Sequence, residues 1–171
     1  YGIKGYILSM MEAGLTLSKY QLTPKQMEQI ILIGKNLINK PILLLDQVEA
    51  TLEILSKKYK LVVVTKGDLK DQHRKLHLSG LGKYFHHIEV LSDKQPIDYE
   101  KLLQRLEIEP KDFLMVGNSL KSDVLPVLEI GGNAMHIPFH TTWLHEQIDF
   151  ELTHDKFRVL RNIAEVKDFL V

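Results

Sequence analysis

The sequence contains no cysteine, so disulfide bonds, thiolate metal ligands and thiol catalysis are excluded. An excess of one sign of charge is also missing, because 22 basic side chains are matched by 22 acidic ones and the formal net charge is zero. A basic surface that would attract nucleic acid or an anionic membrane is therefore not expected. We expect neither of these as a partner.

Long hydrophobic runs are absent as well. The longest, residues 30–33 and 42–45, fall far short of the roughly 20 residues of a membrane-spanning helix, and no signal-peptide pattern opens the sequence. The lack of cysteine fits a reducing compartment, so we expect a soluble, cytoplasmic protein. The sequence begins at Tyr1 without a methionine and enters a helical pattern at once, and we expect further chain upstream.

What the sequence does contain is an alternation of strand and helix patterns from residue 41 onward. Hydrophobic residues make up 44% of the 171 residues, enough for one sizeable core. The patterns predict strands over residues 61–64, 88–91, 113–116 and 133–137, with helices over residues 48–55, 69–78, 97–106 and 124–130. This order predicts an α/β fold with a doubly wound, three-layer, Rossmann-like parallel sheet. The β-branched run 61–64 reads as a central strand that is covered on both faces.

Two helical patterns precede the first strand. Apolar residues recur at helical spacing over residues 6–17, with Gly2, Gly5 and Gly14 as expected breaks, and again from Thr23 and Pro24 to residue 37. A helical pair outside the sheet is a candidate cap, and a plain helical extension of the core is the alternative. We therefore divide the chain into residues 1–40 and residues 41–171.

The last third of the sequence gives weaker signals. Residues 139–145 are both aromatic and polar, so His140, Thr141, Thr142 and Trp143 either rim a site or form a structural loop packed by Trp143. Residues 157–170 have an amphipathic pattern that we expect to break near Asn162 and to pack on the outside of the core.

Polar residues follow three of the predicted strands, and parallel strands present their carboxyl ends at one edge of a sheet. Thr65 or the backbone of Gly67 can bind an oxyanion, and Lys94 can neutralise it. Asn118 and Asp123 can supply oxygen ligands to Mg²⁺. The alternative is that Ser122 or Asp123 caps a helix while Asn118 satisfies a tight turn.

These residues resemble the haloacid dehalogenase superfamily of phosphohydrolases. Residues 61–65 look like its second motif, Lys94 looks like its third-motif lysine, and residues 117–123 look like its acidic fourth motif. The resemblance implies a Mg²⁺-dependent phosphatase that acts on a small phosphorylated metabolite through an aspartyl-phosphate. The residue roles that it implies are as follows: catalytic, Thr65, Lys94 and Asp123; substrate-binding, Thr65, Lys66, Gly67 and Lys94; metal-binding, Asn118 and Asp123.

The sequence departs from the family pattern in its first motif. The family nucleophile is an aspartate in an Asp-x-Asp motif that ends an N-terminal strand, and the sequence contains no such strand and motif. Asp46 follows an apolar run, but Val48 stands two residues later, so we interpret Asp46 as a helix N-cap. We expect the central first strand and its aspartates to lie upstream, with residues 1–40 as the remainder of a helical cap. This chain alone is then expected to be inactive.

A second departure is Asn118, where the family commonly has an aspartate. A neutral amide binds Mg²⁺ less strongly than a carboxylate does, so Asp123 carries more of the metal's charge, unless its role is only to orient Lys94. Lys66 also stands where the family often has a smaller polar residue. The alternatives are a non-catalytic domain with the same fold, a metal-independent haloacid dehalogenase, and an unrelated flavodoxin-like binding protein. As a phosphatase the protein is expected to be a monomer or a weak homodimer.

Overall fold

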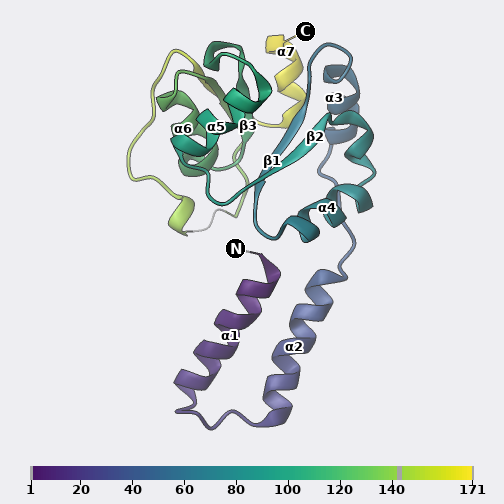
Figure 1. Cartoon of the computed structure of the whole chain (residues 1–171), viewed down its shortest axis with the longest axis vertical. Coiled ribbons are helices and arrows are strands. Elements are labelled where there is room, and N and C mark those ends of the chain that lie inside the picture. Colours follow the sequence, from purple (N-terminus) through teal and green to yellow (C-terminus); the bar gives the residue numbers. More distant parts are fainter. Residues whose placement is uncertain (1, 142–143, 171) are drawn as a thin grey trace.

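The computed structural model describes residues 2–141 and 144–170. Two antiparallel helices, α1 and α2, project from an α/β part that holds all the strands (Figure 1). The α-helices are α1 (Ile3–Leu17), α2 (Pro24–Ile38), α3 (Val48–Leu55), α4 (Leu69–Leu78), α5 (Pro96–Leu106), α6 (Leu125–Glu129) and α7 (Val166–Leu170). The strands are β1 (Val62–Lys66), β2 (His87–Leu91), β3 (Leu114–Gly117), β4 (Asn133–His136) and β5 (Phe157–Val159).

The strands form two parallel sheets. β1 pairs with β2, with Val62 opposite His87, and the second sheet has the order β3–β4–β5, with Leu114 opposite Asn133. Every strand pair is parallel, which confirms the predicted α/β class. Among the described residues, β1 and β3 belong to different sheets, so each of them is paired along one edge.

Helices cover both faces of the sheets, as the three-layer prediction requires. Along β3, Leu114 and Val116 pack in a cluster with side chains of α3 and α7. Met115, which points to the other face, packs in a cluster with side chains of α5 and α6. Leu61 packs against the first cluster and Val64 of β1 against the second, so both sheets contribute to the same two cores.

Among the described residues β1 is an edge strand with β2 as its one neighbour, so the expected central position is not found there. All five residues of β1 are only partly buried. The continuous run of valines is typical of a strand with neighbours on both sides, whereas β1 here is an edge of a two-stranded sheet. The run of valines in β1 is therefore more apolar than an edge strand requires.

The helical pair differs from expectation at its glycines. α1 runs unbroken through Gly5 and Gly14, because a helix tolerates glycine where packing supports it. Gly14 lies against Leu22 and Ile30, so its missing side chain allows the two helices to approach. The predicted start of α2 is confirmed: the Thr23 hydroxyl accepts a hydrogen bond from the backbone N–H of Gln26.

Asp46 is not the N-cap of α3, so that interpretation is wrong. Gln47 occupies the cap position in a left-handed conformation with φ of 62°, and no side chain caps the helix. The Asp46 carboxylate instead accepts a hydrogen bond from the backbone N–H of Gln47 at 2.9 Å. Residues 41–45 before it form no strand.

The C-terminal segment also departs from expectation. Phe157 pairs with Ala134 at the start of β5, so a strand stands where an amphipathic pattern was expected. Leu160 and Val166 are 2% and 1% exposed, so this segment completes the core rather than packing outside it. Among the described residues, none of the helices is both long and apolar enough to span a membrane.

Candidate functional site

The loops after β1, β2 and β3 bring the predicted site residues together. Lys66 ends β1, Lys94 follows β2, and a π-helical turn after β3, Leu120–Val124, carries Asp123. Side-chain contacts join all three loops at the carboxyl ends of the strands. This is the edge at which open α/β sheets bind their ligands.

Lys94 and Asp123 form a buried ion pair. The Lys94 Nζ lies 2.5 Å from the Asp123 Oδ1, and only 10% and 6% of the two side chains are exposed. The other carboxylate oxygen, Oδ2, accepts a hydrogen bond from the backbone N–H of Ser119 at 3.0 Å. Removing such charges from water is unfavourable unless they are paired and hydrogen bonded. The pair therefore holds two opposite charges in fixed positions.

Gly117 allows the Asp123 carboxylate to lie against the end of β3. A Cβ atom at position 117 would overlap this carboxylate, so any larger residue would displace it. Tyr99, which is fully buried, supports the same turn because its hydroxyl donates a hydrogen bond to the Ser122 carbonyl at 3.0 Å. Burial, reinforced by the charge of Asp123, raises the pKa of Tyr99, and its hydroxyl therefore stays a donor.

A second polar network lies beside this ion pair. The Lys66 ammonium contacts the Glu146 Oε1 and the Ser122 Oγ, each at 2.9 Å, and the Asp93 Oδ1 at 3.8 Å. The Glu146 Oε2 accepts hydrogen bonds from the hydroxyls of Ser119 and Ser122. The carboxylate of Glu146 is thus surrounded by donors from two loops.

The charge of Glu146 is strongly stabilised. Burial opposes its ionisation, but hydrogen bonds from Ser119, Ser122 and Lys66 outweigh burial and hold the pKa of Glu146 at about 2. The pKa of Asp93 is also lowered, mainly because its carboxylate accepts a hydrogen bond from the backbone N–H of Lys94. Both carboxylates are therefore ionised at neutral pH.

The remaining predicted residues lie beside these networks in the sequence. The Thr65 hydroxyl donates to the carbonyl of Lys66 at 3.3 Å, and Gly67 has a φ of 121°, which favours glycine. Asn118 is exposed, and its backbone carbonyl oxygen lies 3.0 Å from Nε2 of His136. The predicted roles of all these residues in substrate or metal binding remain predictions.

The side-chain oxygens of two predicted residues are of the type that binds a magnesium ion. Asn118 and Asp123 carry the kind of oxygen ligand that Mg²⁺ prefers, and Gly117 leaves room for the Asp123 carboxylate. Within the described ranges, no group of three or more histidine, aspartate or glutamate side chains is placed to hold a metal. Mg²⁺ is commonly held by one or two carboxylates together with water and substrate phosphate, so two protein ligands would be enough for part of its coordination.

Sequence reasoning missed Glu146 and the two serines that contact it. Glu146 follows the aromatic and polar loop that was expected either to rim the site or to be packed by Trp143; Thr142 and Trp143 lie outside the described residues. No pattern singles out one glutamate in such a loop. Ser119 and Ser122 do lie inside the fourth-motif stretch, so a search of it for hydrogen-bond donors would have found them.

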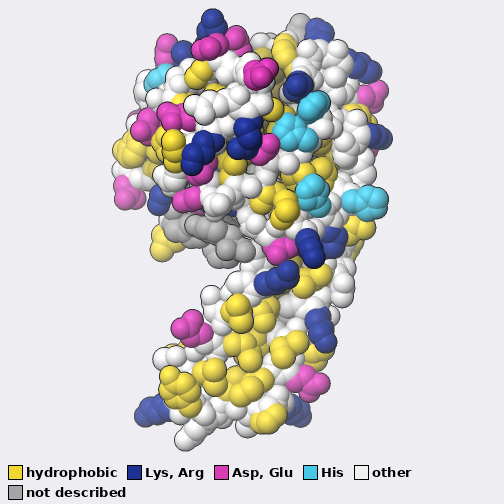
Figure 2. All heavy atoms as spheres, viewed as in Figure 1, with side chains coloured by type: hydrophobic (Ala, Val, Ile, Leu, Met, Phe, Trp, Pro, Cys, Tyr) yellow, Lys and Arg dark blue, Asp and Glu magenta, His cyan; other side chains and the backbone are white. Residues whose placement is uncertain are grey.

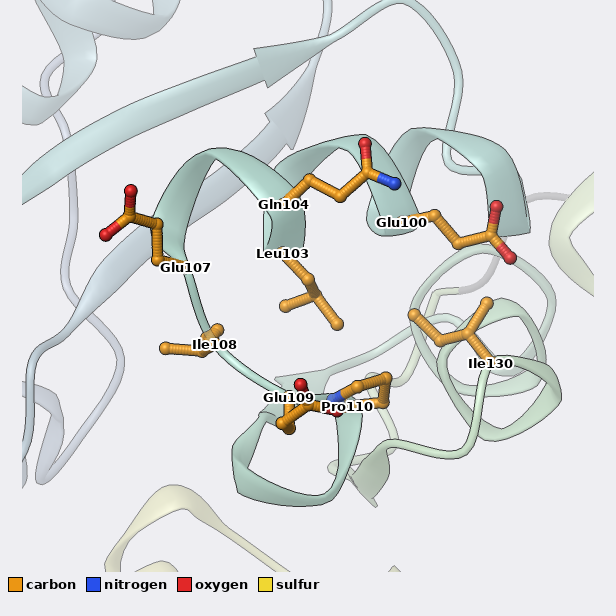
Figure 3. Close-up of a pocket in the computed structure, with 8 residues that line it drawn as sticks. All are labelled: Glu100, Leu103, Gln104, Glu107, Ile108, Glu109, Pro110 and Ile130. Carbon is orange, nitrogen blue, oxygen red and sulfur yellow. The ribbon is translucent and has the colours of Figure 1, made fainter.

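A hollow lies elsewhere, around the C-terminal half of α5 (Figure 3). It measures about 540 Å³, and Leu103, Ile108, Pro110 and Ile130 are its apolar lining residues. Its remaining lining residues are polar, among them three glutamates. No predicted site residue lines it, and the chemistry of the chain therefore concentrates at the sheet edge instead.

Comparison with known proteins gives concordant results. The sequence profile of the haloacid dehalogenase-like hydrolases matches residues 4–131. A solved haloacid dehalogenase-like hydrolase from Xanthomonas campestris is 30% identical, with a TM-score of 0.90 over 99% of this chain and 72% of its own. A HAD hydrolase from Bacillus subtilis, solved bound to magnesium, is 18% identical, with a TM-score of 0.69 over 98% of this chain and 79% of its own.

One relative carries a named activity. N-acylneuraminate-9-phosphatase from Mus musculus is 26% identical over an alignment of 134 residues, and the match covers 75% of this chain. The match spans 52% of the mouse protein, or about half of its length.

Proposed function

The chain belongs to the haloacid dehalogenase-like hydrolase family, and on this premise we propose that the protein is a Mg²⁺-dependent phosphatase of a small phosphorylated metabolite. The observation that carries the proposal is the buried Lys94–Asp123 pair at the carboxyl ends of the strands. A fixed ammonium there can neutralise a phosphoryl oxygen, and a fixed carboxylate can hold a cation beside it. The phosphatase activity named for the mouse relative supports the same reaction class.

The proposed reaction proceeds in two steps through an aspartyl-phosphate. An aspartate carboxylate attacks phosphorus while the bond from phosphorus to the leaving oxygen breaks, and a second carboxyl group protonates that oxygen. Water then gives a proton to the second carboxylate and attacks the phosphoryl group, so the bond from phosphorus to the aspartate oxygen breaks, phosphate leaves and both side chains are restored. Thr65, the Gly67 amide and Lys94 bind the phosphoryl oxygens, while Asn118 and Asp123 hold Mg²⁺. When bound, the ion supplies charge that stabilises the transition state.

We further propose that the nucleophile lies on a strand that enters between β1 and β3. Each of these two strands is paired along one edge, and unpaired parallel edges are unfavourable. Val64 of β1 packs against the cluster that holds Met115 of β3, so the two edges already belong to one core. On this proposal the helical pair, residues 1–40, is the remainder of a cap over the site.

The test is a phosphatase assay on the protein as its gene encodes it, with p-nitrophenyl phosphate and a titration of Mg²⁺. We expect turnover that EDTA abolishes and that Asp123→Asn lowers by about 100-fold or more. Asp123→Asn keeps the size of the side chain and an acceptor for the Ser119 N–H. Glu165→Gln, which alters a surface ion pair with Arg161, is the matched control.

Metal-independent turnover that survives Asp123→Asn would contradict the proposal. Halide release from a 2-haloacid without Mg²⁺ would favour the dehalogenase alternative. Absence of both activities from the folded protein would favour a non-catalytic role.

A further inference from the structure

Glu146 links the loops that carry the candidate site. Its carboxylate is only 13% exposed and pairs with Lys66, whose side chain is 14% exposed. Lys66 and Glu146 stand 80 residues apart in the sequence, so the contact ties the end of β1 to the loop after β4. None of the predicted roles explains why a carboxylate should be held so firmly here.

The hydrogen bonds of Ser119 connect Glu146 to Asp123. The Ser119 hydroxyl donates to the Glu146 Oε2, while the backbone N–H of the same residue donates to the Asp123 Oδ2 at 3.0 Å. Lys94 holds the opposite oxygen, Oδ1. The Ser119 hydroxyl also accepts from the backbone N–H of Ser122 at 2.9 Å, which fixes the turn between them. Asp123 is thus oriented by Lys94 on one side and through Ser119 on the other.

We propose that Glu146 is a positioning residue of the candidate phosphatase site, which acts through Ser119 to hold Asp123 in the orientation that a divalent cation requires. The inference rests on the proposed function, because it takes Asp123 as a metal ligand. Residues that hydrogen bond to metal ligands typically change metal affinity or activity by about 10- to 100-fold when they are removed. Glu146 reaches its target through one intervening residue, so we expect the lower end of this range.

A second effect of Glu146 must be separated from this one. Its carboxylate lies 2.9 Å from the Lys66 ammonium, whereas that of Asp93 lies 3.8 Å away, so removing the Glu146 charge leaves the ammonium less well neutralised and weakens cation binding without any change in Asp123. Ser119→Ala separates the two effects because it leaves every charge in place and removes the hydroxyl of the residue that also bonds Asp123, while the Ser122 hydroxyl keeps its own contact with Glu146.

The experiment measures Mn²⁺ binding to the protein as its gene encodes it, by the electron paramagnetic resonance signal of the free ion. Mn²⁺ prefers the same oxygen ligands as Mg²⁺. We expect Glu146→Gln to weaken binding about 10-fold and Ser119→Ala to weaken it several-fold. The loss of Mn²⁺ affinity in the double variant should be smaller than the product of the two single losses, because both substitutions break the same connection.

The controls are matched in kind. Glu165→Gln removes a carboxylate that is paired with Arg161. Ser79→Ala removes a hydroxyl that accepts a hydrogen bond from the backbone N–H of Leu81. Both should leave Mn²⁺ binding unchanged. Circular dichroism establishes that each variant is folded, and if Glu146→Gln does not fold, Ser119→Ala alone carries the test.

Wild-type Mn²⁺ affinity in Ser119→Ala would overturn the proposal, since Glu146 would then act through its charge alone. A lower KM for the phosphate ester with unchanged Mn²⁺ affinity in Glu146→Gln would also overturn it, because Glu146 would then occupy a substrate position. Binding is measured without turnover. A wild type that binds Mn²⁺ but hydrolyses no ester refutes the proposed function alone, and a wild type that binds no Mn²⁺ refutes both.

Discussion

Lys94 and Asp123 can be buried because each neutralises the other. Their side chains are about one-tenth exposed or less, and the carboxylate has a further hydrogen bond from Ser119. A buried ion pair adds little net stability compared with apolar residues, but the loss of one partner leaves an uncompensated charge in the interior. The pair therefore holds two charges in place and adds little to the net stability of the fold.

Replacing Lys94 alone should therefore be costly. We expect Lys94→Met to lower the free energy of unfolding by about 3 to 5 kcal/mol, since Asp123 would stay buried without its partner. Lys94→Met combined with Asp123→Asn should recover at least half of this loss. Urea unfolding at neutral pH measures both changes. A Lys94→Met variant as stable as the wild type would show that the pair is open to water.

Glu146 should make the stability of the protein depend on acid pH. Its pKa lies at about 2 in the folded state against an ordinary value of 4.5. A lowered pKa contributes stability above pH 4.5, and this contribution is lost as the pH falls from there through about 2. The full contribution is roughly 3 kcal/mol on the scale of 1.36 kcal/mol per pKa unit.

The measurement compares urea unfolding of the wild type and Glu146→Gln at several pH values. The glutamine variant cannot lose a proton, so the stability advantage of the wild type should shrink as the pH falls below 4.5. Glu53→Gln, which alters an exposed ion pair with Lys57, serves as the control for a surface carboxylate. An advantage that stays constant with pH would contradict the network around Glu146.

Among the elements, the helical pair shows most clearly that packing can override the low helix propensity of glycine. Figure 2 shows apolar side chains over this pair, and its exposed large apolar residues are Tyr6, Leu8, Leu17, Tyr20, Ile31, Leu32 and Ile33. Gly34 is buried where α2 meets Ile7 of α1. Gly14 and Gly34 therefore mark the contact between the helices rather than breaks in them.

Two glycine substitutions test this contact. A Cβ at position 34 would come 2.5 Å from Cγ1 of Ile7, so we expect Gly34→Ala to destabilise the helical pair by about 1 to 2 kcal/mol despite the better helix propensity of alanine. A Cβ at position 5 meets no atom within 4 Å, so Gly5→Ala should stabilise by about 0.5 to 1 kcal/mol. Thermal unfolding followed by circular dichroism measures both, and equal gains in the two variants would contradict the packing.

The sequence predicts most elements because their signals are local. Residues 69–78 were predicted as a helix, and α4 has the bounds Leu69–Leu78. Asp68 is its N-cap, and the Asp68 side chain accepts a hydrogen bond from the backbone N–H of Asp71. β5 was missed because it spans only Phe157–Val159 and is specified by pairing with β4. Gln47 was missed as a cap because its left-handed conformation leaves no mark in the residue type.

For the whole molecule, the candidate site is brought together by topology. The order of strands and loops was enough to predict that Lys94 and Asp123 converge, and their ion pair is found. The Glu146 network could not be predicted, because it depends on where a loop without a regular pattern places one side chain. The same limit applied to β1, whose valines indicate a neighbour on each side while the described residues supply only one.

The most direct test of the proposed phosphatase is to trap its covalent intermediate. The protein as its gene encodes it is mixed with a radiolabelled phosphate ester and Mg²⁺, quenched in acid, and its bound label is treated with hydroxylamine. We predict label on an aspartate that hydroxylamine removes, that EDTA prevents and that Asp123→Asn strongly reduces. Turnover that leaves no label on the protein at any quench time, or label on a residue other than aspartate, would contradict the account.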